Sequence, residues 1–205
     1  MHLYLIRHGY SCANDIKLVT GDKLDQLHPL GIEQARLTNR WIAEFIHDAE
    51  LFIVSDWGRA RQTAELLFPI ASWVEDSRLG ETNAGSVSND YLSDFISTFP
   101  DFYLSNSNRY PGGESHNELN VRVLACLSDL IKSYMGKTVV AVTHSGPISC
   151  ILQHVCGLDM SSFPKFIPLN TSVSRVDFKR DSDGIVKAKI KYFSLCPTSL
   201  LKNVK

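Results

Sequence analysis

Near its N-terminus the chain reads Leu3-Tyr4-Leu5-Ile6-Arg7-His8-Gly9, an apolar run that leads directly into an arginine, a histidine and a glycine. Two later segments share this arrangement. Residues 51–54 form an apolar run before Ser55, and residues 138–142 form another before a threonine and His144. Short apolar runs bounded by polar segments are typical of strands that are buried on both faces. We therefore expect three buried strands, each followed by polar side chains.

Helical patterns lie between these strands. Apolar side chains recur at near-helical spacing in residues 31–46, and residues 119–134 repeat the pattern more clearly. Alternating strands and helices predict an α/β fold, a three-layer α/β/α sandwich with a mostly parallel central sheet. Ligands of such folds bind beyond the carboxyl ends of the strands, which is where Arg7, His8 and His144 are expected.

Two regions depart from this alternation. Residues 83–113 are rich in Ser, Asn, Asp and Gly and carry several aromatic side chains, so we interpret them as an insertion that caps the site. Residues 171–178 and 185–193 alternate as strands do, and residues 180–184 predict the turn of a hairpin between them. Because no repeat or linker is visible, we expect residues 1–205 to form a single domain.

The composition limits the possible partners. A formal net charge of −1 provides no global attraction for nucleic acid or an anionic membrane, so any anion must be bound by locally placed groups. No run approaches the ~20 apolar residues that cross a bilayer, and no basic segment precedes Leu3, so we expect a cytoplasmic protein. The five cysteines lack Cys-x-x-Cys spacing, which favours reduced thiols over disulfides or a zinc site.

The segment Arg7-His8-Gly9 is a weak signal by itself, because a structural histidine and arginine at the start of a loop would explain it equally well. The rest of the sequence adds groups of the same kind. Ser55 and Arg59 stand at the start of an expected helix, and His144 precedes another. A buried core histidine is the alternative for His144. The three strand ends together indicate one chemistry at a shared site.

Six groups of residues, in chain order from residue 3 to about residue 150, form a pattern that is specific as a whole although each group alone is not. They are Arg7-His8-Gly9 with Asn14, residues 27–35, Ser55 with residues 59–64, Leu79-Gly80-Glu81, residues 111–115, and His144-Ser145-Gly146. With this pattern the chain resembles the histidine phosphatase superfamily, in particular its phosphoglycerate mutase-like family.

The resemblance implies a mechanism. It implies that His8 is the nucleophile that becomes transiently phosphorylated, and that Arg7, Arg59 and His144 hold the phosphate. Glu81 stands at the family's matching position for the general acid, although by position alone it would be a solvated loop carboxylate. No cofactor is implied, and no His-x3-His or His-Cys spacing favours a metal site.

Elementary electrostatics agrees with these roles. A phosphomonoester is doubly negative near neutral pH, and the planar guanidinium of arginine offers two parallel hydrogen bonds to its oxygens. One ring nitrogen of His8 must be unprotonated to attack phosphorus, and the charges of Arg7 and Arg59 should lower the pKa of this imidazole. The other ring nitrogen needs an acceptor, which the sequence does not identify.

Other side chains have weaker assignments. Asn14, Ser11 and Ser145 are expected to contribute hydrogen bonds to the phosphate, although a turn or cap role explains Asn14 and Ser11 equally well. Arg61 points to another side of its helix than Arg59, which favours a structural or surface role. The remaining histidines are expected to be structural or exposed: His2, His28, His47, His116 and His154.

The sequence also departs from the family pattern at three places. Tyr10 stands where an acidic residue or glutamine is common, residues 86–90 replace an expected aromatic-Glu-Gly segment, and Ser145-Gly146 replaces the common Gly-Gly. We therefore expect the substrate side of the site to be unusual.

Three functions are compatible with these residues. The first is a phosphatase that hydrolyses a small phosphorylated metabolite. A phosphoglycerate-type mutase is the nearest rival, but it needs extra cations around the mouth of the site, and residues 83–113 contain Arg109 alone. The third is a phosphate-binding regulatory module, against which the presence of both His8 and Glu81 argues.

The sequence leaves the substrate open among esters of sugars, glycerate, amino acids, nucleoside-like groups such as α-ribazole, and phosphopeptides. It also leaves open whether the chain forms homo-oligomers.

Overall fold

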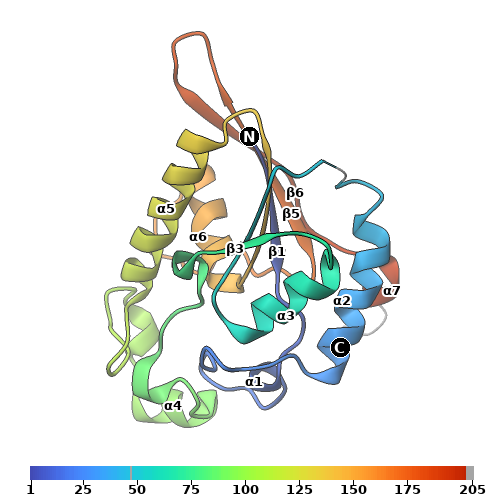
Figure 1. Ribbon diagram of the computed structural model, residues 1–205. Helices are drawn as coiled ribbons and strands as arrows, with labels where there is room; N and C mark the ends of the chain where they lie inside the picture. Colours follow the sequence, from blue (N-terminus) through green and yellow to red (C-terminus); the bar gives the residue numbers. More distant parts are fainter. Residues whose placement is uncertain (47, 202–205) are drawn as a thin grey trace.

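A computed structural model of the chain describes residues 1–46 and 48–201, and a six-stranded sheet lies at its centre (Figure 1). The strand order is β3-β2-β4-β1-β5-β6. Strands β1 to β4 pair in parallel, and β5 runs antiparallel to both of its neighbours. The strands are β1 (His2–Arg7), β2 (Leu51–Val54), β3 (Trp73–Glu75), β4 (Thr138–Thr143), β5 (Val173–Arg180) and β6 (Val186–Leu195).

Helices cover both faces of this sheet. The α-helices are α1 (Cys12–Asp15), α2 (Pro29–Ile42), α3 (Gly58–Leu67), α4 (Leu92–Thr98), α5 (His116–Ser133), α6 (Ser145–Val155) and α7 (Thr198–Leu201), and the short 3-10 helices are η1 (Ser77–Leu79), η2 (Gly85–Val87) and η3 (Phe102–Leu104).

Two hydrophobic cores explain the layers. Leu3 and Leu5 of β1 pack with α5 and α6, whereas Tyr4 and Ile6 pack with α2 and α3 on the other face (Figure 1). Because successive side chains of a strand point to opposite faces, one apolar run supplies both cores. The predicted three-layer α/β/α sandwich with a mostly parallel sheet is confirmed.

The helix predicted over residues 31–46 begins earlier and ends earlier. Pro29 occupies its first turn, and the backbone N–H of Leu30 donates to Nδ1 of His28 at 3.2 Å, which caps the N-terminus. The helix ends at Ile42, and beyond it the Glu44 and Phe45 N–H groups bond to the third residue back, which makes tighter turns than an α-helix.

The helix predicted from residue 119 starts at His116 instead. A capping box sets this start: the Ser115 hydroxyl accepts from the Glu118 N–H at 3.2 Å, and the Glu118 carboxylate accepts from the Ser115 N–H at 2.8 Å. The first turn of α5 therefore includes His116.

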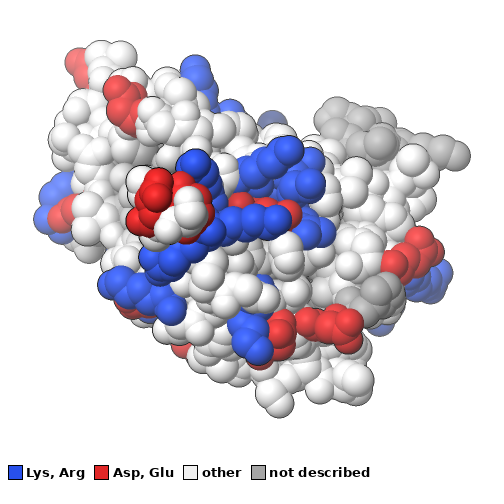
Figure 2. All heavy atoms as spheres, turned by 90° about the horizontal axis from the view of Figure 1, so that it is seen from above, with Lys and Arg blue, Asp and Glu red and all other residues white. Residues whose placement is uncertain are grey.

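The predicted C-terminal hairpin is present as β5 and β6, shifted by about two residues along the chain. Its edge strand β6 exposes Lys187, Lys189 and Lys191, an arrangement that discourages pairing with another sheet edge. Figure 2 views the molecule from above Figure 1 and shows Lys and Arg interspersed with Asp and Glu on this end. This charged end lies opposite α1 and α4, where β1 finishes (Figure 1).

The segment interpreted as a cap carries a small apolar cluster of its own. Ala84, Phe95, Phe102 and Tyr110 are buried against one another, separately from the two main cores. Helix α4 lies near α1 at the end of the sheet where the parallel strands finish (Figure 1). Residues 83–113 therefore lie beside the position at which an α/β sheet binds its ligands.

Candidate active site

Three neighbouring strands at the centre of the sheet, β1, β4 and β2, end at the site. The His8 N–H donates to the carbonyl oxygen of Thr143 at 2.9 Å, and the Ser55 N–H donates to that of Val142 at 3.0 Å. These bonds continue the parallel pairing beyond the strands and bring the rings of His8 and His144 to 5.0 Å between centroids.

A cavity of about 270 Å³, which we call the His8 cavity, opens beside this point. Its volume is at the small end for ligand sites. The structure does not bring Ser11 to its surface, and His144 contacts the His8 ring without lining the cavity. The other predicted site residues do line it: Arg7, His8, Asn14, Arg59, Glu81 and Ser145.

His8 is only 2% exposed, and its hydrogen bonds define its tautomer. Its Nδ1 lies 2.7 Å from the carbonyl oxygen of Gly9, which can only accept, so Nδ1 carries the proton. Nε2 then holds a lone pair, to which Arg59 Nε–H donates at 3.2 Å. Burial, followed by the charges of Arg59 and Arg7, holds the pKa of His8 well below its ordinary value. His8 is therefore a neutral imidazole with a nucleophilic Nε2.

The loop that follows His8 depends on a close backbone contact. A Cβ on Gly9 would lie 2.7 Å from the carbonyl oxygen of Gly31, and a Cβ on Gly31 would collide with the backbone of Tyr10. The loop therefore packs directly against the first turn of α2.

Arg59, in the first turn of α3, is a buried and fixed cation. Its Nη1 lies 3.1 Å from the Asp25 carboxylate, and its Nη2 donates to the Thr20 carbonyl at 3.1 Å. The guanidinium carbon lies 4.6 Å from the centre of the Trp57 ring, a cation–π contact. Burial lowers the pKa of Arg59 and the charge of Asp25 opposes this shift.

Two buried nitrogen atoms around His8 have no hydrogen-bond partner among the described residues: Arg7 Nε and His144 Nδ1. The rest of each side chain is held, since Arg7 Nη1 donates to the Pro168 carbonyl at 2.6 Å and His144 Nε2 lies 2.8 Å from Ser55 Oγ. Burial lowers the pKa of Arg7 to about 10 and holds the pKa of His144 well below its ordinary value. An unpaired buried polar group costs about 1–3 kcal/mol, and Arg7 lines the His8 cavity, so a ligand there that bonds to Arg7 Nε would remove this cost.

Glu81 lies in the loop after η1 and faces the start of α6. Its Oε2 accepts from the Gly146 N–H at 3.2 Å, and its Oε1 accepts from the Thr82 N–H at 2.9 Å. A Cβ on Gly146 would collide with the Glu81 carboxylate. The variant segment Ser145-Gly146 therefore keeps a glycine at the position where the carboxylate needs room.

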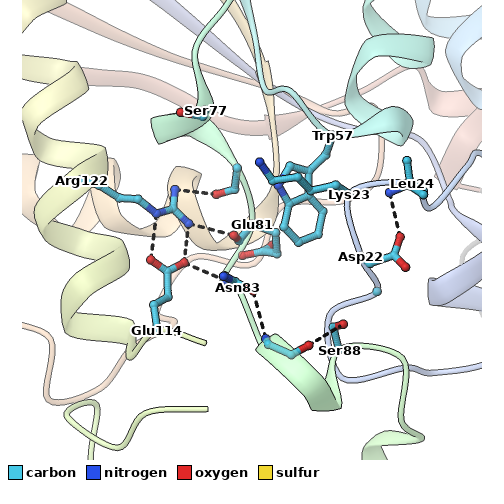
Figure 3. Close-up of a pocket in the computed structure, with 13 residues that line it drawn as sticks. Asp22, Lys23, Leu24, Trp57, Ser77, Glu81, Asn83, Ser88, Glu114 and Arg122 are labelled. Atoms are coloured by element: carbon cyan, nitrogen blue, oxygen red, sulfur yellow. Dashed lines mark hydrogen bonds and ion pairs between the residues drawn. The ribbon is translucent and has the colours of Figure 1, made fainter. Parts of the chain in front are cut away.

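Arg122 of α5 fixes the loop that carries Glu81 (Figure 3). Its guanidinium donates to the carbonyl oxygens of Arg78, Gly80 and Glu81 at 2.8, 2.9 and 2.8 Å. Two further bonds reach the Glu114 carboxylate at 2.9 and 2.6 Å, so all five N–H groups are used. Arg122, Glu114 and Glu81 border a second cavity of about 510 Å³, which shares Glu81 with the His8 cavity.

Asn14 and Ser11 form the capping box of α1. The Asn14 N–H donates to Ser11 Oγ at 3.3 Å, and the Ser11 N–H donates to Asn14 Oδ1 at 3.2 Å. The sequence left open whether Ser11 bonds to phosphate or caps a helix. Ser11 is fully buried, and its hydroxyl takes the cap role. Asn14 combines the cap with a place on the cavity surface.

Sequence reasoning missed part of the cavity. His116 was expected to be structural or exposed, but it lines the His8 cavity together with Tyr103, Tyr110 and Phe163. The local signal for its position is the capping box at Ser115, which makes His116 the first residue of a helix. Arg122 was also missed, because its partners come from segments distant in sequence.

The other histidines have varied surroundings. His2 pairs with Asp177 at 2.7 Å, His28 caps α2, and His154 is exposed. His47 lies outside the described residues.

The sequence pattern that defines the histidine phosphatase superfamily (branch 1) matches residues 3–191 of this chain. The chain belongs to this superfamily. Its members are phosphatases or mutases, so membership supports an enzyme and leaves the choice between these two reactions to the geometry of the site.

Known proteins resemble this chain over most of its length. A probable phosphoglycerate mutase of Yersinia pestis is 29% identical over 188 residues, which cover 87% of this chain and 86% of the relative. A mycobacterial glucosyl-3-phosphoglycerate phosphatase superposes with a TM-score of 0.81 at 21% identity, covering 94% of this chain and 98% of the other.

A putative α-ribazole-5′-phosphate phosphatase from Escherichia coli K-12 also superposes with a TM-score of 0.81 at 21% identity, covering 94% of this chain and 95% of the other. These structures bear out the fold, and the differing names show that one fold serves several substrates.

Further features of this superfamily member concern membranes, metals and thiols. Within residues 1–46 and 48–201, no helix is long and apolar enough to span a membrane. In the same ranges, no three His, Cys, Asp or Glu side chains form a group that could hold a metal ion. All five cysteines are free thiols.

Proposed function

We propose that the protein is a phosphomonoesterase that hydrolyses a small phosphorylated metabolite through a phosphohistidine formed on His8. The observation that carries this proposal is the 2.7 Å hydrogen bond between His8 Nδ1 and the Gly9 carbonyl oxygen, which leaves the lone pair on Nε2. Membership in the histidine phosphatase superfamily supports the same chemistry.

In the first step the phosphate dianion binds beside Arg7 and Arg59, and the hydrogen bond from Arg59 moves from His8 Nε2 to a phosphate oxygen. Nε2 attacks phosphorus with its lone pair while the bond from phosphorus to the ester oxygen breaks. Glu81, in its protonated form, gives its proton to the leaving oxygen, which departs as a neutral alcohol. The products are an alcohol, phosphohistidine and the Glu81 carboxylate.

In the second step the roles of Glu81 reverse. Its carboxylate takes a proton from a water molecule, whose oxygen attacks phosphorus as the bond between Nε2 and phosphorus breaks. Inorganic phosphate leaves, and His8 and Glu81 return to their starting protonation states. No co-reactant besides water is consumed.

The charges around the cavity favour hydrolysis over phosphomutase chemistry. Among the described residues that line the His8 cavity, the arginines and lysines are Arg7 and Arg59 alone. Arg109, the cation of the insertion, pairs with Glu118 at 2.8 Å and borders a different hollow. A mutase must hold a bisphosphorylated intermediate, whose second phosphate requires cations of its own.

The test is hydrolysis of para-nitrophenyl phosphate in the presence of a chelator, with wild type, His8→Ala and the matched control His154→Ala. We expect His8→Ala to lose at least ~10³-fold in kcat, because the nucleophile is removed, and the exposed control to retain wild-type activity. Radiolabelled substrate should label wild type and the control covalently and leave His8→Ala unlabelled. Equal turnover by His8→Ala would reject the proposal.

A further inference from the structure

Four rings form a second surface of the His8 cavity: Tyr103, Tyr110, His116 and Phe163, which we call the aromatic wall. The ring centroids of His116 and Phe163 are 5.0 Å apart, and Tyr103 stacks on His116 with an interplanar angle of 18°. The hydroxyl oxygens of Tyr103 and Tyr110 lie 3.2 Å apart. Aromatic side chains offer a ring a large apolar area and a favourable stacked or edge-to-face geometry.

His116 offers a hydrogen-bond acceptor within this wall. The Asn106 Nδ2 donates to the Met160 carbonyl, which turns Asn106 Oδ1 toward His116 Nδ1 at 3.2 Å. Because Oδ1 can only accept, Nδ1 carries the proton and Nε2 carries the lone pair. Nε2 has no hydrogen-bond partner among the described residues. Burial lowers the pKa of His116, and the charges of Glu81 and Glu114 oppose this shift.

The charge distribution excludes a second anion on the substrate. Among the described residues of the His8 cavity, Arg7 and Arg59 serve the reacting phosphate, and the one further Asp, Glu, Lys or Arg side chain is Glu81, which offers an anion no countercharge. The aromatic wall supplies no cation. A carboxylate or second phosphate on the alcohol part would lose its hydration without gaining a countercharge.

The size of the cavity sets a further limit. Its volume of about 270 Å³ corresponds to roughly nine water molecules at their share of liquid volume. This space accommodates a phosphate group and one ring.

We infer that the alcohol part of the substrate is an uncharged ring that packs on the aromatic wall and donates a hydrogen bond to His116 Nε2, which makes His116 a specificity-determining residue. This inference rests on the proposed phosphatase function, because it assumes that the phosphate binds at Arg7, Arg59 and His8.

The experiment compares three matched esters: phenyl phosphate, 3-hydroxyphenyl phosphate and 3-carboxyphenyl phosphate. Their dissociation constants are measured by calorimetry on His8→Ala, which does not consume them. We expect the hydroxyl ester to bind about 3- to 10-fold more tightly than the phenyl ester, the size of one hydrogen bond, and the carboxyl ester to bind about 10-fold more weakly.

Variants at residue 116, made in the His8→Ala protein, test whether His116 causes the preference for the hydroxyl ester. His116→Phe keeps a ring and lacks the acceptor, so the ratio between hydroxyl and phenyl esters should fall to about one. His116→Gln retains an acceptor oxygen and should keep part of the preference. His154→Phe makes the same exchange at an exposed site and should keep the full ratio. Circular dichroism verifies that each variant is folded.

The outcomes separate this inference from the proposed function. A carboxyl ester that binds as tightly as the phenyl ester, a hydroxyl preference that survives His116→Phe, or no binding of any ester overturns the inference. Wild-type turnover of phenyl phosphate is measured in parallel and reports on the chemistry alone. If the wild type does not turn over phenyl phosphate but the three esters bind in the expected order, the proposed function is rejected and the inferred recognition of the ring by His116 is supported.

Discussion

The two surfaces of the His8 cavity are built in different ways. The phosphate end, formed by Arg7, His8, Arg59 and Glu81, is held by bonds to backbone groups and buried ions, such as the 2.7 Å bond from His8 to Gly9. The aromatic wall is held mainly by ring contacts that His116, the first residue of α5, makes with Tyr103 before this helix and with Phe163 after α6. The chemistry therefore depends on the sheet, and the recognition of the alcohol depends on the loops.

This difference has a kinetic meaning. Substitutions at the phosphate end should lower kcat for every ester, because the same reacting atoms are affected each time. Substitutions in the aromatic wall should change KM for some esters more than for others. The experiments that follow test this division in order of the expected size of effect.

The largest effect is expected from Glu81→Gln, which keeps the shape of the side chain and removes the acid. We expect kcat for an alkyl phosphate to fall by about 10²- to 10⁴-fold. The loss should be smaller for para-nitrophenyl phosphate, whose leaving group departs without a proton. Steady-state assays of both esters check this, with the exposed Glu75→Gln as control; equal losses for both esters would contradict the role of an acid.

A smaller effect is expected from Arg122→Leu, because Arg122 positions the Glu81 loop and touches no reacting atom. We expect kcat to fall by up to ~100-fold while KM changes little, since misplacing a reacting group by about 1 Å costs this much. Arg122→Lys, which lacks the planar fork, should recover only part of the rate. Arg36→Leu, an exposed helix position, serves as control. A raised KM with unchanged kcat would argue for direct substrate binding instead.

The buried imidazole of His8 should make stability depend on pH. Its folded pKa lies below the value of about 6.5 for the unfolded chain, so below this pH the unfolded state binds more protons. The stabilisation is present above about pH 6.5 and is lost as the pH falls toward the folded pKa. Urea unfolding at about pH 7.5, 6.5 and 5.5 should show a shallower decline for His8→Gln than for wild type. If the free energy of unfolding falls equally with pH in wild type and His8→Gln, His8 is not the cause of the pH dependence.

The smallest effect is expected in the aromatic wall. Tyr110→Phe removes the hydroxyl that lies 3.2 Å from Tyr103, and the free energy of unfolding should fall by about 0.5–1.5 kcal/mol. The kcat for phenyl phosphate should remain within a few-fold of wild type, because the phosphate end is untouched. Chemical denaturation and kinetics measure both quantities, with the exposed Tyr91→Phe as control. A large loss of kcat would contradict the claim that the aromatic wall affects recognition and leaves the chemical step unchanged.

Much of the fold could be predicted because its signals are local. The apolar runs of β1, β2 and β4 and the periodicity of α5 are readable within a few residues each. Strand β3 was not predicted, since its three residues become a strand only by pairing with β2. The end of α2 at Ile42 was missed for a different reason, because the apolar spacing continues through turns that are no longer helical.

In the candidate site, too, the residues with local signals could be predicted and those placed by tertiary packing could not. Arg7, His8 and Arg59 could be selected because strand ends and a family pattern mark them. The place of His116 could not, because its contact with Phe163 and the orientation of Asn106 depend on tertiary packing between distant segments. For Ser11 the sequence allowed a helix-cap role and a hydrogen bond to phosphate equally. The burial of Ser11 in the structure favours the cap role.

The contact between Gly9 and Gly31 limits how this protein can change over evolutionary time. A Cβ on Gly9 would meet the Gly31 backbone and a Cβ on Gly31 would meet the Tyr10 backbone, so neither glycine can gain a side chain while the two segments keep their places. The loop after His8 and the start of α2 must therefore vary jointly or remain fixed. Libraries for directed evolution of new substrates should spare both glycines and place their diversity at Tyr103, His116 and Phe163.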